Sequence, residues 1–217
     1  MRPASHGRGE AFPLANAVFA LSVHDPGSLP PPGAPEIAFA GRSNAGKSSA
    51  INALAGRRRL AFVSKTPGRT QLINFFSLGG RGYLVDLPGY GYAGVPHAVR
   101  EHWKHLVGSY IAERPSLAGV VVVMDVRHPL TGLDRMLLDA LHDARREIHV
   151  LLTKADKLSK QSAQAALAKV RRELATHYPG ATAQLFSSLN RDGIAEAAVR
   201  LGSISRGAKN KAPAKGE

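Results

Sequence analysis

The chain has 217 residues, a formal net charge of +13 and no cysteine. This length suits one well-buried domain with tails, and the missing cysteines exclude a disulfide framework or a thiolate metal site. The excess of Lys and Arg favours a polyanionic partner, RNA before lipid, over a purely solubilising surface. The longest apolar run, Leu117–Met124, is far too short to span a bilayer, and the N-terminus lacks the apolar core of a signal peptide.

The two ends of the chain differ in composition from its middle. Residues 1–34 are a Pro/Gly-rich lead-in that we expect to be partly disordered, with Ala17–Val23 as either a short helix or an edge strand. Residues 35–202 are predicted to form one domain. The stretch 203–217 is rich in basic residues and has no aromatic residue, which predicts a disordered basic tail.

Between these ends, apolar strands alternate with amphipathic helices. Predicted strands cover residues 37–40, 71–78, 82–85, 120–124, 148–152 and 183–186, and predicted helices cover 47–54, 97–112, 133–144, 162–175 and 194–201. This alternation predicts an α/β fold of three layers, a mostly parallel sheet of about six strands with helices on both faces. The turn at 79–81 is too short for a parallel crossover, so one strand is antiparallel.

A glycine-rich loop lies between the strand at 37–40 and the helix at 47–54. Residues 41–48 read GRSNAGKS, which fits the phosphate-loop pattern G-x-x-x-x-G-K-[ST] in the strand-to-helix context it requires. Backbone N–H groups and the helix N-terminus favour phosphate there, with Lys47 on the β and γ phosphates and Ser48 on Mg²⁺. The predicted nucleotide contacts in this loop are Gly41, Arg42, Ser43, Asn44, Ala45, Gly46, Lys47 and Ser48.

A second motif, Asp86-Leu87-Pro88-Gly89, ends the strand at 82–85. Four such residues are a weak signal alone, because many turns contain them. After a phosphate loop and at a strand end, they predict a γ-phosphate sensor. Asp86 is expected to hold Mg²⁺ through water, and the N–H of Gly89 to contact the γ-phosphate.

A third motif, Thr153-Lys154-Ala155-Asp156, follows the strand at 148–152. The carboxylate of Asp156 can accept hydrogen bonds from N1 and N2 of guanine, and adenine offers no such pair. Lys154 is expected to lie across the purine plane and Thr153 to brace the loop, although GTPases usually carry Asn at that position. Phe186, Ser187 and Ser188 follow the last strand, where a backbone N–H would meet guanine O6.

The segment 57–69 breaks all periodicity and is basic. A threonine hydroxyl in such a loop can complete the coordination of Mg²⁺ when a triphosphate is bound, and spacing alone leaves both Thr66 and Thr70 as candidates. The arginines at 57–59 either bind RNA or keep the loop solvated.

Taken together, these motifs resemble those of the EngB (YihA/YsxC) group of bacterial GTPases, within the TrmE-Era-EngA-EngB superfamily. The distinctive stretches are Lys65–Gln71 and Asp86–Ala93, and the similarity covers residues 15–202. It implies a small monomeric, cytoplasmic GTPase that acts in assembly of the large ribosomal subunit and is required for normal division septum formation. The implied partners are rRNA and ribosomal proteins of the large-subunit precursor, with no membrane and no DNA.

The resemblance also assigns ligands. It implies Ser48 and Thr70 as direct Mg²⁺ ligands, with GTP or GDP as the bound nucleotide. It adds a further stretch to the nucleotide contacts, comprising Gly68, Arg69, Thr70, Gln71 and Leu72.

The residues expected to carry hydrolysis are Lys47, Asn44, Thr70 and Gly89. Tyr90 stands where Ras-type enzymes place the glutamine that orients water, which predicts slow intrinsic hydrolysis of about 10⁻⁴ to 10⁻³ s⁻¹. Asn44 matches an asparagine that holds K⁺ in the similar MnmE group, where the ion supplies the charge of an arginine finger. The alternative is that Asn44 braces a tight loop.

Other functions fit less well. A GTPase of another pathway, such as RNA modification or metal transport, usually carries an additional domain that this length does not accommodate. An RNA-binding protein with a vestigial site is at odds with intact Lys47, Ser48, Asp86 and Asp156. Trp103 is expected to pack in the core rather than face a partner.

Overall fold

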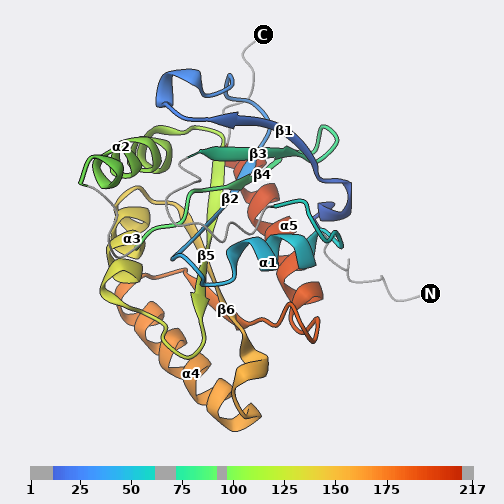
Figure 1. The fold of residues 1–217 in the computed structure, drawn as a ribbon, viewed down its shortest axis with the longest axis vertical. Helices are drawn as coiled ribbons and strands as arrows, with labels where there is room; N and C mark the ends of the chain where they lie inside the picture. The colour runs from blue at the N-terminus through green and yellow to red at the C-terminus, as the bar shows by residue number, and fades with distance from the viewer. Residues whose placement is uncertain (1–11, 62–71, 92–96, 212–217) are drawn as a thin grey trace, which may run out of the picture.

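The computed structural model describes residues 12–61, 72–91 and 97–211. Within these ranges, seven strands form a single sheet that is covered by five α-helices (Figure 1). The strands are β1 Val18–Val23, β2 Glu36–Gly41, β3 Ile73–Ser77, β4 Tyr83–Asp86, β5 Leu117–Asp125, β6 Glu147–Thr153 and β7 Thr182–Leu185. The helices are α1 Lys47–Leu54, α2 His97–Glu113, α3 Gly132–Asp143, α4 Lys160–His177 and α5 Ile194–Lys211, with 3₁₀ turns at Leu14–Asn16, Pro26–Ser28 and Ala155–Lys157.

The strand order across the sheet is β1-β3-β4-β2-β5-β6-β7. β3 runs antiparallel to both of its neighbours, β1 and β4, and the remaining pairs are parallel. The predicted α/β class and the single antiparallel strand are therefore confirmed. The sheet has one strand more than the six expected, because Val18–Val23 pairs with β3 and is the edge strand rather than a helix.

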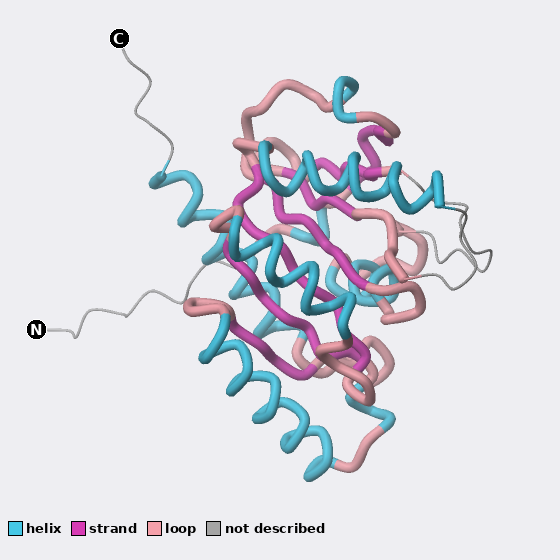
Figure 2. Tube along the Cα trace, turned by 90° about the vertical axis from the view of Figure 1, so that its left-hand side faces the viewer, coloured by secondary structure: helices cyan, strands magenta, loops and turns pink. Residues whose placement is uncertain are grey.

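Alternation along the strands creates a separate core on each face of the sheet. Ala38, Val120 and Val122 face α2, α3 and α4, whereas Phe39 and Val121 face α1 and α5. Figure 2 looks onto the first of these faces, with helices in front of the strands. The three predicted layers are thus present, and both cores consist of buried, mostly aliphatic and aromatic, side chains.

The expected domain boundaries need correction at both ends. Phe12, Leu14 and Ala17 are buried against the α1–α5 face, so the packed unit starts well before residue 35. At the other end, α5 runs to Lys211 instead of giving way to a tail at residue 203. The reason is that Ile204 continues the buried series of Ala197 and Leu201 along one side of the helix. Residues 212–217 lie outside the described part of the chain.

The parallel strands bring their carboxyl ends to one edge of the sheet. In the register, Phe39 of β2 lies beside Asp86 of β4, and Asp125 of β5 lies beside Thr153 of β6. Ligands of open α/β sheets bind at this edge. The three sequence motifs therefore meet in space although they are far apart in the chain.

Candidate nucleotide-binding site

The phosphate loop is shaped by the backbone between β2 and α1. Asn44 and Gly46 have φ values of 63° and 94°, and the N–H of Ala45 donates to the carbonyl of Arg42 over 3.0 Å. At Gly41, a Cβ would lie 2.8 Å from the carbonyl oxygen of Val123 in β5, so only glycine fits. The loop has the predicted form, in which backbone N–H groups can converge on phosphate.

Lys47 and Asp86 form an ion pair at the centre of the site, and both side chains are largely buried. Lys47 is the first residue of α1 and Asp86 the last of β4, so the two motifs are in direct contact. Ser48 follows Lys47 in the first turn of the helix. Hydroxyl and carboxylate oxygens are the ligands that Mg²⁺ prefers.

These residues fit a magnesium ion that is shared with a nucleotide. Within the described ranges, no three His, Cys, Asp or Glu side chains are grouped closely enough to enclose a metal. Mg²⁺ in phosphate sites is typically held by one or two protein oxygens, with phosphate oxygens and water completing the octahedron. Ser48 and Asp86 match that pattern.

The γ-phosphate sensor is tied to the phosphate loop by its backbone. The N–H of Ser43 donates to the carbonyl of Tyr90 over 2.9 Å, and the N–H of Tyr90 donates to the carbonyl of Gly41 over 3.4 Å. A Cβ on Gly89 would lie 3.3 Å from the Oγ of Ser43. That hydroxyl is buried and has no hydrogen-bond partner in the described structure. A buried polar atom without a partner, between two motifs for phosphate, is consistent with a ligand there.

Tyr90 occupies the position of the Ras glutamine, but its side chain is not placed to take part in catalysis. Its side chain is 7% exposed, and its hydroxyl donates to Asp134 of α3 over 3.0 Å. Burial, together with the Asp134 carboxylate, raises the pKa of Tyr90 well above its usual range. The phenol therefore stays protonated near neutral pH and does not act as a base. Trp103 packs edge-on against Tyr90 and donates to the carbonyl of Pro88 over 2.8 Å.

Thr153 makes the bracing contact that was predicted for it. The side chain is buried, and its hydroxyl lies in hydrogen-bonding contact with the carbonyls of Ala45 in the phosphate loop and of Met124 in β5. A shorter side chain than the usual asparagine thus still connects the base-reading loop, residues 153–156, to the phosphate loop.

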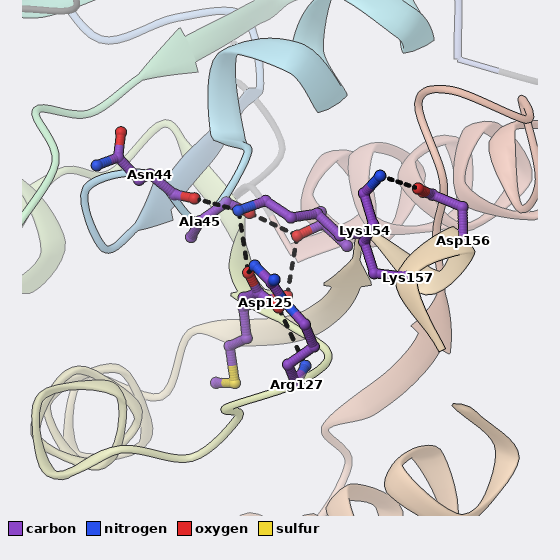
Figure 3. A network of polar contacts seen from close by, with 9 residues as sticks. Asn44, Ala45, Asp125, Arg127, Lys154, Asp156 and Lys157 are labelled. Carbon is purple, nitrogen blue, oxygen red and sulfur yellow. Dashed lines mark hydrogen bonds and ion pairs between the residues drawn. The ribbon is translucent and has the colours of Figure 1, made fainter. Parts of the chain in front are cut away.

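Lys154 reaches the same loop from the neighbouring position. Its backbone is left-handed, with φ of 59°, and its Nζ donates to the carbonyl of Asn44 over 2.7 Å (Figure 3). Nζ also lies 2.9 Å from the Asp125 carboxylate.

Asp156 is held by the loop that follows β7. Ser187 is fully buried, and its hydroxyl donates to Oδ1 of Asp156 over 2.6 Å. This hydrogen bond lowers the pKa of Asp156 below its usual value, so the group is ionised near neutral pH. The carbonyl of Phe186 accepts from the N–H of Ala155 over 3.2 Å, which joins the two loops through the backbone as well.

The structure thus brings together the predicted residues of the three motifs and of the loop at Phe186–Ser188. The predicted contacts Gly68, Arg69, Thr70 and Gln71, and the alternative Mg²⁺ ligand Thr66, lie outside the described residues. Leu72 is described and stands just before β3.

Sequence reasoning missed Asp125, which contacts Lys154 of the base-reading loop, and Arg127, which contacts Asp125. Asp125 accepts hydrogen bonds from the Arg127 guanidinium, over 2.9 Å from Nε and 2.6 Å from Nη2. A signal was available in the sequence, because both residues come directly after the apolar strand at 120–124. The carboxyl end of that strand lies at the same edge of the sheet as the phosphate loop and the base-reading loop.

Comparison with known proteins agrees with this geometry. The family model described as "50S ribosome-binding GTPase" matches residues 36–154. The probable GTP-binding protein EngB of Methylobacillus flagellatus is 57% identical over 187 residues, covering 86% of this chain and 90% of the relative. The same-named protein of Aromatoleum aromaticum is 60% identical over 181 residues, covering 83% and 84%. The chain belongs to the EngB family of GTP-binding proteins.

Solved structures support the fold. A crystal structure of a probable GTP-binding protein engB matches with a TM-score of 0.65 at 23% identity, covering 79% of this chain and 99% of that one. A GTP-binding protein from Sulfolobus solfataricus in complex with GDP matches with a TM-score of 0.53 at 19% identity, covering 80% and 53%. No helix in the described residues is long and apolar enough to cross a membrane.

Proposed function

We propose that this EngB-family protein is a GTP-hydrolysing switch that acts in assembly of the large ribosomal subunit. The observation that carries the nucleotide part is the double contact of the base-reading loop with the phosphate loop, from Thr153 to Ala45 and from Lys154 to Asn44. These contacts fix Asp156 relative to the phosphate-binding backbone. A guanine nucleotide can bind to both at once, with its base on Asp156 and its phosphates on the backbone of the phosphate loop.

Each motif then has one task. The backbone at 41–48 and Lys47 bind the phosphates, Gly89 senses the γ-phosphate, and Asp156 accepts the guanine N–H pair. Ser48 and Thr70 directly, and Asp86 through water, are the oxygens that would hold Mg²⁺. When bound, the ion neutralises charge that develops on the phosphate oxygens.

Hydrolysis is expected to be slow without an activator. The Tyr90 hydroxyl donates its proton to Asp134, so this proton is not available to orient an attacking water. Asn44 is exposed, and its side-chain amide has no hydrogen-bond partner in the described structure, whereas its carbonyl is used by Lys154. A free amide oxygen beside the phosphate loop favours the proposal that it holds K⁺ over the alternative of loop bracing. Equal hydrolysis rates in Na⁺ and K⁺ would remove K⁺ from this proposal.

The first test is a titration of the wild type and Asp156→Asn with GDP, XDP and ADP. The wild type is expected to prefer GDP strongly. Asp156→Asn is expected to weaken GDP and to improve XDP, because an amide can pair with the xanthine carbonyl in place of the guanine N–H groups. Equal ADP and GDP binding by the wild type would mean that the base-reading loop is misassigned.

The ribosomal part of the proposal is supported by the family description, the charge of +13 and one structured basic turn. Arg57, Arg58 and Arg59 are exposed and have no acidic partner within the described ranges. The turn is clamped by Asn52, whose Oδ1 accepts from the N–H groups of Leu60 and Ala61 over 2.9 and 2.8 Å. Its Nδ2 donates to the carbonyl of Ala61 over 2.9 Å. Three guanidinium groups on a fixed turn suit the phosphate backbone of folded RNA.

Charge reversal tests this contact. We expect the triple variant Arg57→Glu, Arg58→Glu and Arg59→Glu to bind large-subunit precursor particles more weakly. The slope of the logarithm of the binding constant against the logarithm of salt concentration should become shallower by about three. Lys160→Glu, Lys169→Glu and Arg172→Glu on exposed positions of α4 make the same change in net charge and serve as the control. Equal losses in both triple variants would indicate a nonspecific charge effect.

The switch itself makes a separate prediction. A non-hydrolysable GTP analogue should strengthen binding of the wild type to these particles. A septation defect should follow indirectly, from ribosome shortage.

A further inference from the structure

Asp125, the last residue of β5, accepts hydrogen bonds from four donors around one carboxylate. Oδ1 accepts from the backbone N–H of Arg127 over 3.0 Å and from its Nε over 2.9 Å. Oδ2 accepts from Nη2 of Arg127 over 2.6 Å and lies 2.9 Å from Nζ of Lys154. A carboxylate offers about four acceptor sites, so all of them are used.

This carboxylate stays charged although it is largely buried. Burial by itself raises the pKa of Asp125, but the hydrogen bonds from Arg127 and Lys154 outweigh it and hold the pKa well below the usual value. The pairing in turn raises the pKa of Arg127. The negative charge at the end of β5 is therefore permanent near neutral pH.

Lys154 is held at both ends of its side chain. Its backbone is fixed in the left-handed region, and its Nζ is shared by the Asn44 carbonyl and the Asp125 carboxylate (Figure 3). A lysine side chain that is free to rotate loses conformational entropy when it is ordered. Because Asp125 and Asn44 already order it, that cost is met before any ligand binds.

We propose that Asp125 is a positioning residue of the guanine site, which acts through Lys154. It holds the lysine between the phosphate loop and the base-reading loop, so that the methylene stem stands ready beside the purine bound by Asp156. Arg127 completes the arrangement by filling the acceptor sites of Asp125 that Lys154 does not use. The inference builds on the guanine-nucleotide site proposed above.

A double-mutant cycle with a fluorescent GDP derivative tests it on the full chain. Asp125→Asn is expected to lower GDP affinity about tenfold, equivalent to about 1.4 kcal/mol, because the amide no longer accepts fully from both cations. Lys154→Met keeps the stem, removes the charge and is expected to lower affinity at least as much. In the Lys154→Met background, Asp125→Asn should cost less than about twofold. Asp139→Asn, which alters a carboxylate bonded to Tyr178 over 2.7 Å between α3 and α4, is the matched control and should bind as the wild type does.

The outcomes separate the inference from the function it builds on. If the wild type does not bind GDP, the proposed function is wrong. If the wild type binds but Asp125→Asn costs the same with and without Lys154, Asp125 acts only on the fold and the inference is overturned. Should Asp125→Asn be too unstable to purify, the cycle with Asp125→Ser gives the same decision. Urea unfolding of each variant reports the stability change separately.

Discussion

The hydroxyl of Ser187 donates a hydrogen bond of 2.6 Å to the carboxylate of Asp156, so a buried serine from one loop orients the carboxylate that we propose reads guanine. Ser187 itself is anchored, because its N–H donates to the carbonyl of Asp192 over 3.1 Å. Its Oγ accepts from the N–H of Asn190 over 3.1 Å. The carboxylate is thus presented to the ligand in one orientation and in its charged form.

Ser187→Ala is expected to lower GDP affinity about tenfold, since a charge-assisted hydrogen bond contributes about 1.5 to 3 kcal/mol. The pH dependence should change as well. The pKa of Asp156 is depressed, so binding that needs its charge is present above that pKa and is lost as pH falls through it. Without Ser187 the pKa returns toward its ordinary value, and the acid limb of GDP binding moves to higher pH. Titrations between pH 3 and 7 measure this, and Ser188→Ala is the neighbouring control.

Replacing Thr153 by valine removes the hydroxyl while keeping the shape. The carbonyl of Ala45 would then be buried without this donor, and we expect a stability loss of about 1 to 3 kcal/mol together with weaker GDP binding. Thr153→Asn restores a donor of the kind other GTPases use and should retain both properties better. Urea denaturation and GDP titration check this, and equal loss in the two variants would contradict the bracing role.

Gly91 and Gly80 offer a matched pair of substitutions. Both have φ of 78°, but a Cβ on Gly91 would lie 2.8 Å from Cδ1 of Leu133, whereas a Cβ on Gly80 has no neighbour within 4 Å. Gly80→Ala should cost about 1 to 2 kcal/mol from its left-handed backbone alone. Gly91→Ala should cost about as much, because the atom it meets is the far end of the Leu133 side chain, which is 42% exposed and can move aside. A clearly larger loss of stability in urea would mean that Leu133 cannot give way.

Trp103 provides an internal reporter, since the chain contains one tryptophan. Its indole N–H donates to the carbonyl of Pro88 inside the γ-phosphate sensor. Exchange of GDP for a non-hydrolysable GTP analogue should therefore shift tryptophan fluorescence. In Gly89→Ala, whose added Cβ meets the Ser43 hydroxyl at 3.3 Å, the shift should be reduced at saturating nucleotide. Identical spectra in all states would show that the sensor does not move.

The parts predicted well from the sequence are those fixed by local chemistry. The helix Lys47–Leu54 has the predicted bounds because the phosphate loop specifies where it starts. The strands of the central sheet were found because they are apolar runs bounded by turn residues. The three motifs meet at one edge of the sheet because the parallel strands all end there.

What the sequence left open or missed depends on tertiary contacts. Ala17–Val23 was predicted as either a short helix or an edge strand, because most of these side chains are exposed, and only the pairing of Val18–Val23 with β3 decides between them. The extension of α5 depends on Ile204 packing on the sheet, which a basic composition conceals. Asp125 and Arg127 carry no motif, and their role becomes visible only when β5 is placed beside β6.

The γ-phosphate sensor is held by backbone hydrogen bonds at Leu87 and Tyr90, and this limits how far its backbone can move when a ligand binds. Leu87 is fixed by the hydrogen bond of its N–H to the Phe39 carbonyl over 3.0 Å, and Tyr90 is fixed to both Gly41 and Ser43. Only Pro88 and Gly89 lie between them, and the Pro88 carbonyl is already held by Trp103. A segment this short and held at both ends cannot make a large loop movement. We therefore expect that binding of the terminal phosphate rotates the peptide unit between Pro88 and Gly89. This rotation would move the Pro88 carbonyl, and with it the Trp103 indole and helix α2.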